Sequence, residues 1–90
     1  MPRIAIIEDQ FEDLATQLFG SGRLELGYRD MGPIDLVWTL QTGDTVRAFL
    51  HRVGDWCVTW RSGGSSPSLL GVEFDTSLRQ AMVDIALKMP

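Results

Sequence analysis

Residues 23–29, RLELGYR, place a large apolar side chain at every second position. This period of two is typical of a β-strand that has one buried face. The same alternation recurs over residues 34–41, 45–53 and 56–61, and residues 69–74 are long enough to add a strand at the sheet edge. Because the connections between these segments are short, we expect successive strands to lie side by side and antiparallel.

Two segments with a helical period flank the strands. Apolar side chains recur at spacings of three and four residues over 11–19 and again over 78–89, which places them on one face of each helix. Glycines directly after the first segment predict its end. Asp75 or Thr76 is placed to cap the start of the second helix, and Lys88 falls in its last turn.

Together these elements predict an α+β fold. Ninety residues suffice for one hydrophobic core, so we expect a single domain over residues 1–90. Its architecture would be an antiparallel meander of four to five strands, with the N- and C-terminal helices packed on one face. The orientation of the third strand stays open, because Val46 and Ala48 point one way while Arg47 and Phe49 point the other.

The charge balance narrows the classes of function. Twelve acidic residues oppose eight basic ones, which gives a net charge of -4, whereas free-standing binders of duplex nucleic acid usually carry the opposite balance. No apolar run approaches the roughly 20 residues of a membrane span, and the first residues lack a signal-peptide core. Cys57 is the only cysteine, so no intrachain disulfide can form. We therefore expect a cytoplasmic protein that contacts no membrane.

The acidity is concentrated near the start of the chain, since residues 1–20 carry a net charge of -3 while residues 21–61 are neutral. Four carboxylates there are spaced so that they gather on one side of the first helix. Carboxylates in the first turns of a helix favour the positive end of its dipole, and they would also complement a basic partner. The predicted partner-binding residues are Glu8, Asp9, Glu12 and Asp13, with Asp30, Asp35 and Asp44 as lesser contributors.

The sheet face turned away from the helices is a second candidate surface. It would combine arginines with apolar side chains, as surfaces that bind single-stranded nucleic acid do. Arginine also suits protein interfaces, because its planar group makes bidentate contacts. The residues of this alternative nucleic-acid face are Arg23, Arg29, Arg47, Arg61 and Phe49.

Enzymatic chemistry finds little support in the sequence. A two-residue turn at Gly54-Asp55 would pair His51, the only histidine, with Val58 rather than with Cys57. The Gly/Ser-rich segment 62–68 lacks the Lys-Ser/Thr of a phosphate-binding loop, and we predict that it is a flexible connection. We expect no enzymatic activity, no cofactor and no metal site.

The last third of the chain has a pattern of its own. An aromatic strand at Trp56–Trp60 is followed by the Gly/Ser loop and by a strand that leads into a helix, Val72–Met82. This pattern resembles small phage and prophage α/β sandwich accessory proteins, a group that includes anti-CRISPR inhibitors. The resemblance implies a small, non-enzymatic protein and transfers no catalytic residue.

Charge and resemblance together predict a non-enzymatic protein-binding module, a phage-encoded inhibitor of a bacterial defence system that acts through its acidic surface. The expected partner is a protein, such as a nucleic-acid-binding host complex whose basic groove the carboxylates would occupy. The alternatives are a nucleic-acid-binding module that uses the arginine-bearing face and an immunity-type protein. The chain would be a monomer or a homodimer, the latter through an exposed edge strand.

Overall fold

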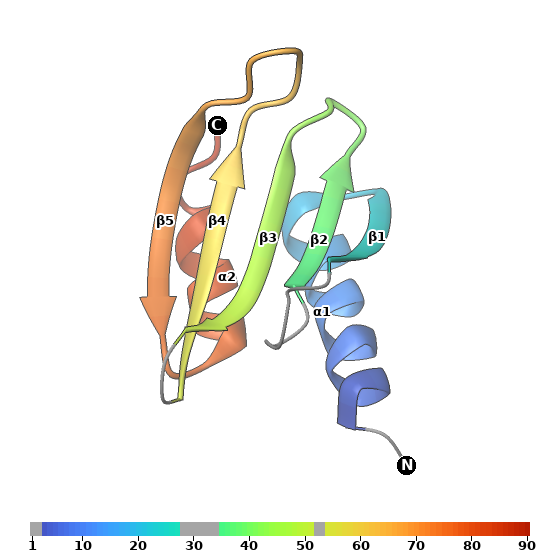
Figure 1. The fold of residues 1–90 in the computed structure, drawn as a ribbon, viewed down its shortest axis with the longest axis vertical. Helices are drawn as coiled ribbons and strands as arrows, with labels where there is room; N and C mark the ends of the chain where they lie inside the picture. The colour runs from blue at the N-terminus through green and yellow to red at the C-terminus, as the bar shows by residue number, and fades with distance from the viewer. Residues whose placement is uncertain (1–2, 28–34, 52–53) are drawn as a thin grey trace.

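A computed structural model describes residues 3–27, 35–51 and 54–90, with side chains from Ile7 onward. Two helices flank five strands along the chain (Figure 1). The elements are α1 (Arg3–Phe19), β1 (Gly22–Gly27), β2 (Asp35–Leu40), β3 (Thr45–His51), β4 (Asp55–Arg61), β5 (Leu69–Asp75) and α2 (Leu78–Ala86).

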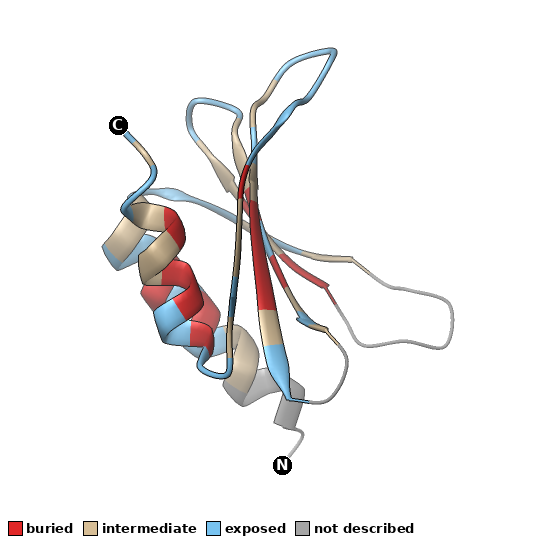
Figure 2. Ribbon diagram, turned by 90° about the vertical axis from the view of Figure 1, so that its left-hand side faces the viewer, coloured by how far each residue is buried: buried red, intermediate tan, exposed pale blue. Residues whose placement is uncertain are grey.

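The strands form one antiparallel sheet in the order β1-β2-β3-β4-β5, so every strand pairs with its neighbour along the chain. Both helices lie on the same face of this sheet (Figure 2). α1 packs against β1 and β2, α2 packs against β4 and β5, and the two helices contact each other. The predicted α+β meander with both helices on one face is therefore confirmed. No helix or strand of the described residues covers the opposite face, which we call the outer face.

The hydrophobic core lies between the sheet and the two helices. β3 directs Val46 and Ala48 toward the helices, where both are fully buried, and directs Arg47 toward the outer face. The inward positions of β2, β3 and β4 meet the apolar stripes of both helices. The buried residues of this core are Phe11, Leu14, Ala15, Leu36, Trp38, Val46, Ala48, Val58, Leu78, Ala81, Met82 and Ile85.

α1 begins at Arg3, about two turns before the helical segment that the periodicity predicted. Ile7 continues the apolar stripe, since it packs against the core one turn before Phe11. Gly20 has a φ of 87° and donates its N–H to the carbonyl of Thr16 (3.1 Å), which ends the helix where expected. The first turn of α1 contains no acidic residue, so the cluster that we expected in the first turns of the helix begins only in its second turn.

The start of α2 is capped by Ser77, not by either of the two residues before it. The Ser77 hydroxyl oxygen accepts a hydrogen bond from the N–H of Gln80 (3.2 Å). Asp75 instead accepts a hydrogen bond from the Ser77 N–H (2.9 Å). The helix also ends before Lys88, contrary to prediction, and the Lys88 ammonium pairs with Glu73 on β5 (2.9 Å).

The hairpin between β3 and β4 is longer than predicted. His51 pairs with Asp55, and Phe49 pairs with Cys57. The predicted pairing of His51 with Val58 is wrong, because β4 begins at Asp55 and the connection holds three residues instead of two. His51 therefore lies at the end of the sheet. On the outer face it is opposite Asp55 and diagonal to Cys57, two residues further along β4.

Candidate functional site

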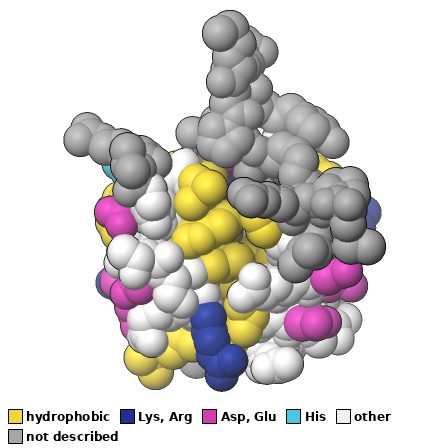
Figure 3. Space-filling view, turned by 90° about the horizontal axis from the view of Figure 1, so that it is seen from below, with side chains coloured by type: hydrophobic (Ala, Val, Ile, Leu, Met, Phe, Trp, Pro, Cys, Tyr) yellow, Lys and Arg dark blue, Asp and Glu magenta, His cyan; other side chains and the backbone are white. Residues whose placement is uncertain are grey.

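The four acidic side chains predicted for partner binding lie along the middle of α1. Asp9, Glu12 and Asp13 are exposed, whereas Glu8 is half-buried; Phe11, between them in the sequence, is fully buried. α1 thus buries its apolar stripe and turns most of its carboxylates to solvent. In the view from below, acidic side chains lie in separate groups on the two sides of a band of hydrophobic ones (Figure 3). We call these four residues the α1 carboxylates.

The electrostatics of α1 do not account for this cluster. The helix dipole favours carboxylates in the first turn, and the residues of this cluster lie beyond that turn. Glu8 and Glu12, like Asp9 and Asp13, are four residues apart, and like charges at that spacing cost about 0.2–0.5 kcal/mol per pair. No ion pair joins any of the four to another described residue. Among the described residues, the cluster therefore opposes helix stability slightly and has no counter-charge.

The three lesser acidic contributors do not extend this surface. Asp30 lies outside the described residues. Asp35 is only 4% exposed, so it is excluded as a surface contributor. Asp44 lies at the turn between β2 and β3, half-buried, and its carboxylate accepts hydrogen bonds within the protein.

Four of the five residues of the alternative nucleic-acid face share the outer face of the sheet. Arg23 on β1, Arg47 and Phe49 on β3, and Arg61 on β4 all stand at outward positions of the register. Arg29 lies outside the described residues. The structure therefore gathers these side chains on the outer face, on the three strands β1, β3 and β4.

Two of these arginines are already neutralised by neighbouring carboxylates. Arg23 forms an ion pair with Glu25 on the same strand (2.7 Å), and Arg47 pairs with the buried Asp35 (3.5 Å). Arg61 forms no ion pair with a described residue. Because phosphate binding depends on uncompensated positive charge, these pairs reduce the attraction of the outer face for a nucleic-acid backbone.

Aromatic rings pack on the outer face near the β3–β4 hairpin. Phe49, Cys57 and Phe74 stand opposite one another on β3, β4 and β5. The ring of His51 meets Phe49 and Phe74 edge to face, with centroids 6.4 and 5.3 Å apart. Cys57 is only 3% exposed. The only histidine is therefore packed between aromatic rings, and the only thiol is covered.

Asp44 has a structural role that the sequence analysis did not predict. Its two carboxylate oxygens accept hydrogen bonds from the indole Nε1–H of Trp60 (3.1 Å) and from the backbone N–H of Gly63 (3.0 Å). The loop after β4 is further closed by the Ser68 N–H, which donates to the Ser62 hydroxyl (2.9 Å). Gly63 also lies so close to Gly43 that an added Cβ would stand 2.6 Å from its carbonyl group. The Gly/Ser segment that we predicted to be flexible is thus tied to the β2–β3 turn.

No protein-family model, no curated protein and no solved structure matches this chain. Within residues 3–27, 35–51 and 54–90, no three His, Cys, Asp or Glu side chains stand close enough together to hold a metal ion. Of the two helices that the structure describes, neither is long and apolar enough to cross a membrane.

Proposed function

We propose that this protein is a non-enzymatic protein-binding module that docks the α1 carboxylates against a basic surface of a protein partner. The observation that carries the proposal is the placement of these carboxylates in the middle of α1, solvent-facing for the most part and without an ion pair to a described residue. A basic partner would supply the counter-charges that the described residues do not.

The energetics support this role. Mutual repulsion of the α1 carboxylates is a cost in the free protein, and a cationic surface relieves it on binding. Charge complementarity of this kind accelerates association and weakens as salt is added. Binding through α1 would therefore be fast and strongly salt-dependent.

The partner class follows from charge and from the resemblance of residues 56–82 to small phage accessory proteins. A nucleic-acid-binding complex of a bacterial defence system has the basic groove that a row of carboxylates can occupy in place of phosphates. We therefore propose a phage-encoded, anti-CRISPR-like inhibitor that acts in the bacterial cytoplasm. An immunity-type protein that blocks a basic toxin would use the same surface.

The test is capture of a partner from bacterial lysate on immobilised protein at low salt, followed by binding measurements with the purified partner. Glu12→Lys/Asp13→Lys should abolish capture, because the double substitution reverses half of the cluster. Glu25→Lys/Asp55→Lys makes the same change in net charge at exposed positions elsewhere, and it should leave capture intact. Equal capture by both double variants, or no specific partner at all, would contradict the proposal.

One observation favours the alternative of a nucleic-acid-binding module, namely the uncovered outer face that carries Arg47, Arg61 and Phe49. The ion pairs on that face count against it, which is why it ranks second. A gel-shift assay with single- and double-stranded DNA and RNA at low salt separates the two functions. Binding that falls steeply with salt and is lost in Arg47→Ala/Arg61→Ala would favour the nucleic-acid module.

A further inference from the structure

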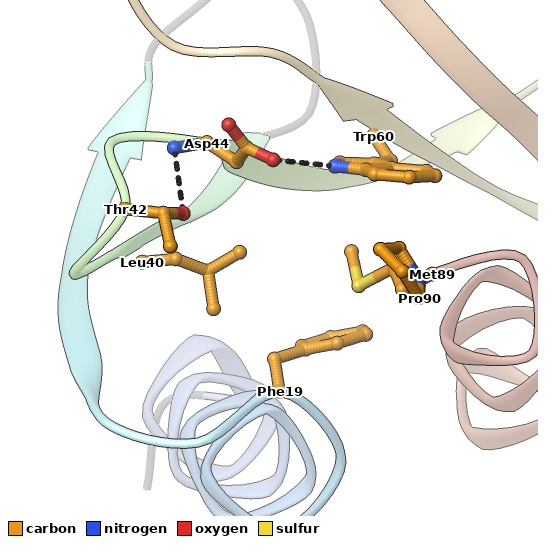
Figure 4. A pocket seen from close by; sticks show the side chains of 7 residues that line it. All are labelled: Phe19, Leu40, Thr42, Asp44, Trp60, Met89 and Pro90. Atoms are coloured by element: carbon orange, nitrogen blue, oxygen red, sulfur yellow. Dashed lines mark hydrogen bonds between the residues drawn. The ribbon is translucent and has the colours of Figure 1, made fainter.

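A pocket opens at the end of the protein where α1 ends and the chain leaves α2 (Figure 4). Its volume is about 200 Å³. None of the α1 carboxylates and none of the outer-face arginines lines it. The lining residues are Phe19, Leu40, Thr42, Asp44, Trp60, Met89 and Pro90.

The walls of the pocket are largely apolar and aromatic. Figure 4 shows the rings of Phe19 and Trp60 on opposite sides of the space, with Leu40 and Met89 facing each other across it. All four residues are half-buried, so part of each remains accessible from outside the protein. Aromatic faces attract cations, because the ring quadrupole is negative above and below the ring plane.

One carboxylate stands at the rim of these apolar walls. Asp44 is fixed there by the hydrogen bonds that it accepts from Trp60 Nε1–H and from the Gly63 N–H. No described lysine or arginine forms an ion pair with it, so its negative charge is not cancelled within the described part of the chain. The pocket therefore combines two aromatic rings with a fixed, uncompensated negative charge.

We propose that this pocket binds a quaternary ammonium group. The negative charge of Asp44 repels an anion, and a neutral apolar group would gain no electrostatic attraction from that charge. A primary ammonium carries three N–H donors, and it would exchange the water around them for walls that are largely apolar, with Asp44 and Thr42 as the polar side chains of the lining. A quaternary ammonium donates no hydrogen bond, contacts the walls through its methyl groups, and keeps its attraction to the carboxylate and the rings.

The same head group occurs on free small molecules of the choline type and on a trimethylated lysine side chain of a protein. The pocket would contact the same trimethylammonium group in both ligands. The two ligands differ in what is attached to that group, which is a short alcohol in choline and a lysine side chain of a polypeptide in the modified protein. This inference concerns residues outside the α1 carboxylates and does not depend on the proposed function.

The primary experiment is an NMR titration of the ¹⁵N-labelled protein with choline chloride and, separately, with its neutral isostere 3,3-dimethylbutan-1-ol, both at constant ionic strength. We expect saturable shifts of the Trp60 indole and Gly63 backbone N–H signals with choline, with a Kd of about 1 mM. The neutral isostere should bind roughly tenfold more weakly. Equal shifts from both compounds, or no saturable shift with choline, would overturn the proposal.

Two variants assign the effect to the charge and to the aromatic wall. Asp44→Asn removes the charge while keeping one acceptor oxygen, and it should weaken choline binding roughly tenfold. Phe19→Leu keeps an apolar wall but removes a ring, and it should reduce the preference for choline over the isostere. This variant tests the proposal independently if Asp44→Asn folds poorly. Glu25→Gln removes one negative charge on the outer face and should bind choline like the parent protein. Unchanged choline binding in both Asp44→Asn and Phe19→Leu would place the ligand elsewhere.

A final pair of titrations identifies the source of the head group. A short peptide that carries trimethyl-lysine should bind more tightly than choline if the ligand is a modified protein, and no more tightly if it is a free small molecule. The same peptide with unmodified lysine should bind more weakly in either case. Equal binding of the lysine and trimethyl-lysine peptides would refute selectivity for the quaternary group.

Discussion

The acidic residues of α1 and those of the sheet differ in what they contact. On α1, four carboxylates form no ion pair with a described residue, and three of them are exposed. On the sheet and its turns, four carboxylates meet a donor or a cation within the protein: Glu25 with Arg23, Asp35 with Arg47, Asp44 with Trp60 and Gly63, and Glu73 with Lys88. The contrast shows that the net charge of -4 is not spread evenly over one acidic surface. The four carboxylates named on the sheet and its turns contact other residues of the protein, whereas Asp55 on β4 is exposed like most of the α1 carboxylates.

The largest effect on stability is expected at Asp44. Asp44→Ala removes the acceptors of the Trp60 indole N–H and the Gly63 N–H, and it should lower the free energy of unfolding by about 2–3 kcal/mol. Urea denaturation followed by tryptophan fluorescence measures this change. Asp9→Ala, which removes an acid of the same size from the exposed side of α1, serves as the control and should change stability by less than about 0.5 kcal/mol. Similar losses in both variants would remove the contrast.

The pair of Asp35 and Arg47 should show an asymmetric effect. Asp35 is almost fully buried, whereas the Arg47 side chain is about half exposed. Arg47→Ala leaves a buried carboxylate without this counter-charge and should cost about 2 kcal/mol, while Asp35→Ala frees a guanidinium that water can reach and should cost about 1 kcal/mol. A double-mutant cycle measured by chemical denaturation gives the coupling between them. A coupling energy near zero would show that the ion pair does not stabilise the outer face.

On α1, removal of charge should increase stability. Asp9→Asn/Asp13→Asn abolishes one like-charge pair four residues apart and should raise the free energy of unfolding by about 0.2–0.5 kcal/mol at low salt. In about 1 M salt, where screening is strong, the difference from the parent protein should vanish. Thermal unfolding at both salt concentrations tests this prediction. A loss of stability at low salt would mean that these carboxylates support the helix after all.

The smallest effect is expected for the exposed pair on β1. Arg23 and Glu25 are both more than half exposed, so their ion pair competes with water and salt. A double-mutant cycle with alanine at both positions should give a coupling of about 0–0.5 kcal/mol. A coupling well above 1 kcal/mol would show that the pair holds the edge of the sheet and is not simply surface charge.

The strand periodicity predicted most of the fold, because inward and outward side chains differ in polarity along residues 23–27 and 56–61. The start of α1 was not predictable in the same way. A short apolar run such as residues 4–7 fits either a strand or a helix, and the packing of Ile7 on the core resolves the ambiguity. The length of the β3–β4 connection was missed because Gly54-Asp55 also fits a two-residue turn.

The candidate site residues were likewise predictable only where the pattern along the sequence decided their position. Helical spacing placed the α1 carboxylates correctly on one side of a helix, but the dipole explanation depended on a helix start that the sequence did not define. The burial of Asp35 and the contacts of Asp44 depend on which residues meet across strands. No local signal encodes those contacts, since Asp44 and Gly63 are joined only when the β2–β3 turn folds beside the loop after β4.

The attachment of α1 to the rest of the fold has a consequence for dynamics. Among the described residues, α1 contacts β1, β2 and α2, and it packs on the sheet less extensively than α2 packs on β4 and β5. Elements with fewer buried contacts open at lower free energy, as separate cooperative units. The amides of α1 should therefore exchange with solvent faster than those of α2. A ligand that recognises only the closed helix would slow this exchange, so occupancy of the acidic side could be followed through backbone amides that face the core.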